Sequence, residues 1–106
     1  MLLAIHHVAI ICADYQKSKH FYSELLGLKI LAEHYRAERQ SYKLDLQLPD
    51  GSQLELFSFV DAPPRPSRPE AQGLRHLSFA VSDVAQTTAW LQQSGITVEP
   101  IRIDPY

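Results

Sequence analysis

The 106-residue sequence has little of several features that mark specialised classes of protein. A single cysteine excludes an internal disulfide framework and fits a reducing compartment. The first residues show no charged segment followed by an apolar one, and no run approaches the roughly eighteen apolar residues of a membrane span. A net charge of −2 gives no electrostatic case for binding nucleic acid or an acidic membrane surface. These absences favour a cytoplasmic protein that binds neither nucleic acid nor membranes.

The residues that are present predict one small domain. The content of 45% hydrophobic and 21% charged residues is typical of a globular protein. Strand-like patterning covers residues 4–12, and Asp14 is placed to cap a helix that ends at Gly27. Strands are expected at residues 29–35, 41–48 and 53–59, with a hairpin turn at residues 49–51. The first sixty residues therefore predict the order β-α-β-β-β.

The second half of the chain repeats the first. IHHVAIICAD aligns with LRHLSFAVSD, which places His7 over His76 and Asp14 over Asp83, both at an offset of 69. A strand at residues 74–81, a helix that begins after Asp83 and a strand at residues 97–103 are expected. We predict one domain over residues 1–106, with a first module at 1–60, a proline-rich connector at 61–73 and a partial second module at 74–106.

Alternation along the strands sorts the polar side chains onto two faces. His7 shares a face with Ala9 and Ile11, whereas Val8 and Ile10 suit the side packed under a helix. By the same alternation His6 points to the packed side and is interpreted as structural. His76 occupies the position equivalent to His7, with Ser78 and Ala80 beside it, so both histidines are expected to face one hollow. Two satisfied strand histidines are the alternative interpretation.

A lone carboxylate accompanies these histidines. In LELF, Glu55 is flanked by Leu54 and Leu56, so it faces the hollow if the two leucines face a helix. A set of two histidines and one carboxylate suits a divalent first-row metal with open positions for water or substrate. A strand-edge carboxylate facing water is the alternative. Cys12 has the parity of Val8 and Ile10, which predicts a buried and inert thiol.

The motifs HHVAI, FYSELLGLKI, LELF and GLRHLSFAV resemble the vicinal oxygen chelate superfamily, which includes glyoxalase I, fosfomycin-resistance enzymes, extradiol dioxygenases and bleomycin-resistance proteins. The resemblance implies an α+β fold in which paired βαβββ modules form a cup-shaped mixed sheet, here with the second module truncated. It places His7, Glu55 and His76 on the first three ligand positions of one divalent metal (Zn, Ni, Co, Mn or Fe, with Zn or Ni favoured). It also implies a homodimer with a small-molecule substrate.

One family feature is missing from the chain. The family's second module bears a late glutamate that completes the metal site, and the repeat would place it about 48 residues after His76, near position 124. The sequence is therefore interpreted as a fragment of a longer chain, with a degenerate family member as the alternative.

The resemblance implies a glyoxalase I-like lyase or isomerase. The metal would stabilise an enediolate or oxyanion of a substrate with two vicinal oxygens. Glu55 is the candidate catalytic base within this sequence, with the late glutamate of the family's second module as the alternative. An extradiol-type dioxygenase using Fe(II) and a non-catalytic, bleomycin-resistance-like binding protein are the alternatives.

Overall fold

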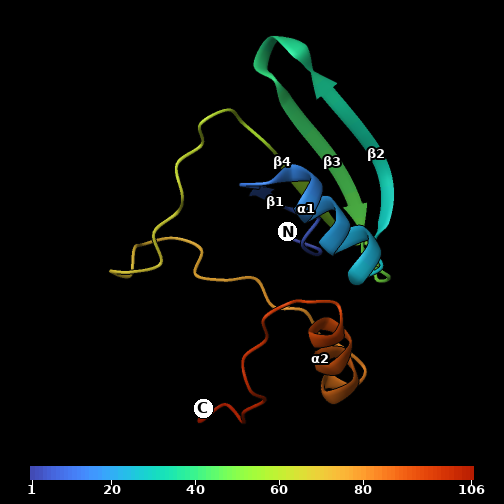
Figure 1. The fold of residues 1–106 in the computed structure, drawn as a ribbon, viewed down its shortest axis with the longest axis vertical. Helices are drawn as coiled ribbons and strands as arrows, with labels where there is room; N and C mark the ends of the chain where they lie inside the picture. The colour runs from blue at the N-terminus through green and yellow to red at the C-terminus, as the bar shows by residue number, and fades with distance from the viewer. The chain divides into compact units, whose positions relative to one another are not determined.

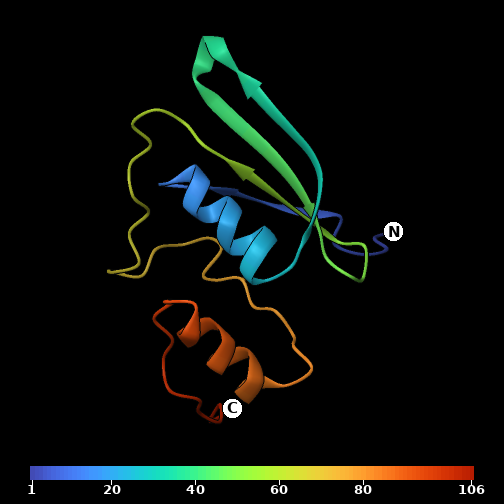
Figure 2. The same ribbon diagram turned by 45° about the vertical axis from the view of Figure 1, so that its right-hand side comes forward.

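A computed structural model describes residues 1–106 as two compact units, Met1–Arg65 and Pro66–Tyr106. The first unit contains one sheet with the strand order β1-β4-β3-β2. Its strands are β1 (His7–Ile11), β2 (Lys29–Arg36), β3 (Ser41–Gln47) and β4 (Gln53–Phe57). β1 and β4 are parallel, whereas the other two pairings are antiparallel. The helical turns α1 (Tyr15–His20) and η1 (Phe21–Leu25) cross one face of this sheet, and the short turn η2 (Ala37–Arg39) joins β2 to β3 (Figures 1 and 2). The predicted α+β class with a mixed sheet is confirmed.

The hydrophobic core lies on the helix side of the two central strands. Four leucines, two on β3 and two on β4, are at most 2% exposed: Leu44, Leu46, Leu54 and Leu56. Their alternation with polar residues gives each strand one apolar face, as the sequence pattern predicts. Each fully buried leucine contributes about 1.5–3 kcal/mol relative to an exposed one. The opposite face of the same strands is therefore free to carry polar groups.

The helix boundaries of the two repeats are alike, as predicted. Asp14 accepts a hydrogen bond from the Lys17 amide at 3.1 Å, and Asp83 accepts one from the Gln86 amide at 2.9 Å. The second helix, α2 (Val84–Gln93), is capped by Ser94 and followed by Gly95, whose φ of +85° is a conformation that glycine adopts without steric cost. The two halves of the chain therefore share an aspartate-capped helix that is followed by a glycine.

Two predicted strands of the second half are wrong. Residues 74–81 and 97–103 form no strand, and α2 is the one regular element of the second unit. A strand requires a neighbour for its backbone amides and carbonyls, and the sequence pattern predicts extended backbone without supplying that neighbour. The extended segments of this unit have no sheet to join, so they remain irregular.

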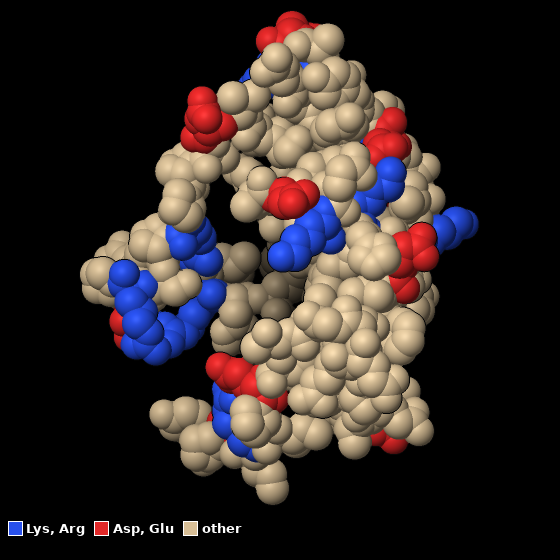
Figure 3. Space-filling view, viewed as in Figure 1, with Lys and Arg blue, Asp and Glu red and all other residues tan.

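No helix in the structure combines the length and the apolar character needed to cross a bilayer. On the face in Figure 3, basic and acidic side chains are mixed on the right of the view, whereas several basic side chains gather at its left. The presence of both signs on this face agrees with the small net charge of the chain.

A polar cluster ties α1 to β2 on the helix side of the sheet. Glu33 accepts hydrogen bonds from the Tyr15 hydroxyl and from Lys19 Nζ, the latter at 2.8 Å. The Tyr15 ring stacks on Tyr42 at a centroid distance of 4.3 Å. The bond from Lys19, followed by that from Tyr15, lowers the pKa of Glu33 below its ordinary value of 4.5.

Because the folded-state pKa of Glu33 is lowered, its contribution to stability is complete above pH 4.5 and is lost as the pH falls through the folded-state value. Glu33→Gln should lower the free energy of unfolding by about 0.5–1 kcal/mol at pH 7, a small value because the side chain is partly solvated. Urea unfolding at pH 7 and pH 3 measures this, and the deficit should shrink at pH 3. The exposed Glu24→Gln serves as control, and an equal deficit at both pH values would contradict the assignment.

Candidate metal centre

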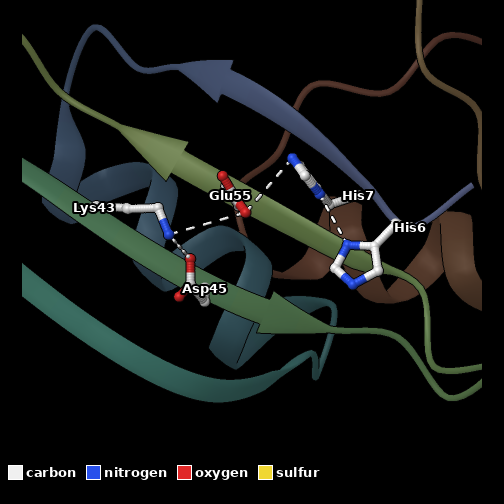
Figure 4. A network of polar contacts seen from close by, with 5 residues as sticks. All are labelled: His6, His7, Lys43, Asp45 and Glu55. Atoms are coloured by element: carbon white, nitrogen blue, oxygen red, sulfur yellow. Dashed lines mark hydrogen bonds and ion pairs between the residues drawn. The ribbon is translucent and has the colours of Figure 1, made fainter.

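His7 and Glu55 lie together on the face of the sheet opposite to the leucine core. β1 and β4 are neighbours, with Ala9 directly opposite Glu55. His7 precedes Ala9 by two residues on β1, so its side chain lies on the same face of the sheet as Ala9 and Glu55. Glu55 Oε2 lies 3.6 Å from His7 Nε2 (Figure 4). The burial of Leu54 and Leu56 fixes which way Glu55 points, because the strand alternates around them. The sequence pattern predicted this face for both side chains.

The separation of these two atoms suits a shared metal ion. Zinc bonds of about 2.1 Å to nitrogen and oxygen at a tetrahedral angle place the two donor atoms about 3.4 Å apart. The observed 3.6 Å is close to that value and is too long for a strong direct hydrogen bond. The His7 side chain is 43% exposed and that of Glu55 is 17% exposed, so an ion could reach the pair from solvent. The donor chemistry and spacing fit a first-row divalent metal.

A second pair of charges, which sequence reasoning missed, borders this site. Lys43 Nζ lies 2.8 Å from Asp45 Oδ1 and 3.9 Å from Glu55 Oε2. Asp45 is directly opposite Glu55 in the β3–β4 register, which brings all three charges to one face (Figure 4). The hydrogen bond to Asp45 raises the pKa of Lys43, so its ammonium group stays charged at neutral pH. The site therefore contains an internal cation beside the candidate ligand carboxylate.

His76 belongs to the second unit, where it is exposed and lies outside any regular element. No three His, Cys, Asp or Glu side chains gather as a metal-binding group in the structure. The structure thus brings together two of the three predicted ligands, and the membership of His76 stays a prediction.

The predicted orientation of His6 is wrong. His6 immediately precedes β1 and is exposed rather than packed under a helix. Its Nδ1 lies 2.9 Å from His7 Nδ1, and the two rings meet edge to face with centroids 5.2 Å apart. The His6 carbonyl accepts a hydrogen bond from the Gln53 amide at 3.0 Å, but β1 itself begins only at His7, and strict alternation of faces applies within a strand. At this end position the His6 ring turns toward its neighbour instead of toward the helix side.

Cys12 agrees with its prediction. It is 7% exposed and carries no disulfide. Burial raises the pKa of its thiol, which keeps the group protonated and unreactive.

Comparison with known proteins places this architecture in a family. The family model of the Glyoxalase/Bleomycin resistance protein/Dioxygenase superfamily matches residues 4–106. The uncharacterized protein YwkD of Bacillus subtilis is 54% identical over 105 residues, which cover 99% of this chain and 82% of that protein. The crystal structure of a glyoxalase family protein from Enterococcus faecalis superposes with a TM-score of 0.88 at 47% identity, over 97% of this chain and 81% of that one.

A more distant solved structure shares the fold alone. A mutant of the fosfomycin resistance protein FosX from Listeria monocytogenes, complexed with Mn(II) and a dihydroxypropylphosphonic acid, has a TM-score of 0.75 at 15% identity, over 99% of this chain and 79% of that one. The match of the family model over nearly the whole sequence, together with the two closer relatives, settles the assignment. The chain belongs to the Glyoxalase/Bleomycin resistance protein/Dioxygenase superfamily.

Proposed function

We propose that the chain is a glyoxalase I-like metalloenzyme that acts on a small substrate with two vicinal oxygens. The observation that carries the proposal is the 3.6 Å approach of His7 Nε2 and Glu55 Oε2 on the open face of the sheet. FosX, which has the same fold, is a precedent for a divalent metal in this architecture. The preference for zinc or nickel and the homodimeric state rest on family membership alone.

His7, Glu55 and His76 would hold the ion. When bound, a divalent ion supplies Lewis-acid polarisation of a substrate carbonyl. Glu55 would add general-base catalysis by removing the proton on the carbon next to that carbonyl. Its Oε2 faces His7 and Lys43, which leaves Oε1 as the oxygen that accepts the proton. The apolar side of β4 excludes water from below the carboxylate, because Leu54 and Leu56 are buried there.

Two measurements test this function. The metal-free chain is titrated calorimetrically with Zn²⁺, Ni²⁺ and Mn²⁺, and the loaded chain is then incubated in D₂O with a panel of α-hydroxyketones and hemithioacetals. We expect about one ion per chain and metal-dependent exchange of the α-proton, followed by proton NMR. A chain that binds no divalent ion, or a loaded chain that exchanges no α-proton in the panel, would contradict the proposal.

A non-catalytic binding protein is the second candidate, favoured by an aromatic surface next to Glu55. The Phe57 and Phe59 rings are parallel within 6° at a centroid distance of 5.9 Å, and the Arg39 guanidinium lies 4.8 Å from the centre of the Phe59 ring. Such a surface suits a flat, anionic ligand. Binding of a planar ligand with equal affinity with and without metal would favour this candidate over the enzyme.

Lys43 should weaken metal binding. A positive charge 3.9 Å from Glu55 Oε2 competes with an ion for that carboxylate, and one such interaction is worth about 1 kcal/mol in water-like surroundings. Lys43→Met should therefore raise the affinity for Zn²⁺ about fivefold at low ionic strength, and less at 0.5 M NaCl. Calorimetric titration measures the change. Lys17→Met, which removes an exposed lysine of α1, is the control, and a weaker affinity in Lys43→Met would contradict the competition.

A further inference from the structure

The contact between His6 and His7 restricts the proton positions of both rings. Their Nδ1 atoms are 2.9 Å apart, which is a hydrogen-bond distance. A neutral imidazole carries its proton on one nitrogen and a lone pair on the other, so two Nδ1 atoms can bond only if one of them is protonated. Two arrangements satisfy this condition. In one of them His7 Nε2 carries the proton, and in the other it carries a lone pair.

The two arrangements differ in whether His7 Nε2 can bind a metal ion. If His6 donates, the His7 proton lies on Nε2, where it faces the Glu55 carboxylate at 3.6 Å, and that atom has no lone pair for a metal. If His7 donates from Nδ1, its Nε2 keeps a lone pair, directed at the side where Glu55 Oε2 lies at 3.6 Å. A histidine that binds a metal almost always donates its other ring N–H to an oriented acceptor. The second arrangement matches that pattern, with His6 as the acceptor. Figure 4 shows the contact between the two rings and the Glu55 side chain on the far side of His7.

We propose that His6 is a positioning residue that holds His7 in the Nδ1–H form and thereby presents the Nε2 lone pair to a divalent metal. This inference rests on the proposed metal function and extends it to a residue outside the ligand set. The edge-to-face contact of the rings, with an interplanar angle of 85°, adds orientation to the hydrogen bond. His6 itself would carry its proton on Nε2 and keep Nδ1 as the acceptor.

The tautomer can be read without metal. Two-bond proton–nitrogen correlation spectra of the metal-free full chain at pH 8.5, where free imidazole is neutral, report which nitrogen of each histidine is protonated. We expect the Nδ1–H form for His7 in the wild-type chain and a shift to the Nε2–H form in His6→Ala. His6→Asn retains an acceptor oxygen near the position of Nδ1 and should restore the wild-type form. A wild-type His7 in the Nε2–H form, or a tautomer unchanged in His6→Ala, would overturn the proposal.

The functional consequence is measured by titration of the same variants with Zn²⁺ alone. Loss of a hydrogen-bond partner behind a metal-binding histidine typically costs 10–100-fold in affinity, and we expect that loss in His6→Ala but less than threefold in His6→Asn. Equal losses in both variants would contradict an acceptor role for His6. If the tautomers behave as expected but the wild-type chain binds no Zn²⁺, the proposed metal function fails while the hydrogen-bond assignment stands.

Discussion

His7→Ala should weaken the binding of Zn²⁺ or Ni²⁺ by at least about 100-fold, with the fold intact. The substitution removes the Nε2 atom that lies 3.6 Å from Glu55 Oε2, and a neighbouring hydrogen-bond partner alone is usually worth 10–100-fold. The fold should survive because the His7 side chain is 43% exposed and the core is built from leucines on the other face. Calorimetric titration gives the affinity, and circular dichroism checks the structure.

His34→Ala is the matched control for this experiment. His34 lies opposite Lys43 in the β2–β3 register, so it is an exposed histidine of the same sheet that has no place in the predicted ligand set. Its loss should leave the affinity within a factor of two. His76→Ala should weaken binding as strongly as His7→Ala, since the repeat predicts equivalent roles. Unchanged affinity in His7→Ala would remove this residue from the site, and unchanged affinity in His76→Ala would restrict the site to the first unit.

Glu55→Gln should lower the rate of α-proton exchange by about 10²–10⁴-fold under saturating metal. This is the range that a positioned general base contributes, and an amide cannot accept the proton. The affinity for the metal should fall by a smaller factor, about tenfold, because the amide oxygen is still a donor but has lost its charge. Initial rates over a series of metal concentrations separate the two effects.

The control for this variant makes the same chemical change elsewhere in the sheet. Glu33→Gln exchanges a carboxylate for an amide on the helix side, where Glu33 is bonded to Lys19 and Tyr15. It should change stability slightly and leave the exchange rate unaltered. If Glu55→Gln restores the full rate once metal is saturating, Glu55 is a ligand only, and another group must move the proton.

The parts of the fold that were predictable are those set by local pattern. LELF has one residue between its leucines, and β4 is paired on both sides, so the pleat holds Glu55 opposite to the core. Asp14 and Asp83 were recognisable as caps because capping depends on an aspartate near the first free amides of a helix. These features depend on a few adjacent residues, and the sequence carries them explicitly.

The parts that were not predictable depend on neighbours distant in the sequence or on where pairing starts. Residues 74–81 alternate like a strand, but alternation does not supply a partner strand. His6 follows the same apolar pattern as His7, but β1 begins after it. The network of Lys43, Asp45 and Glu55 requires the β3–β4 register. One feature of the sequence pointed to this network. The alternation in KLDL places Lys43 and Asp45 on the strand face opposite to the leucines, as LELF does for Glu55.

In the proposed function, His7 Nε2 and Glu55 belong to one metal site. Proton–cadmium correlation NMR of the full chain loaded with ¹¹³Cd²⁺ tests it most directly, because scalar coupling arises only through a coordinate bond. Coordination through Nε2 predicts correlations from cadmium to both the Hδ2 and Hε1 protons of His7, which disappear in His7→Ala and weaken in Glu55→Gln as the ion is lost. A chain that carries cadmium but shows no correlation to the His7 ring would contradict the account.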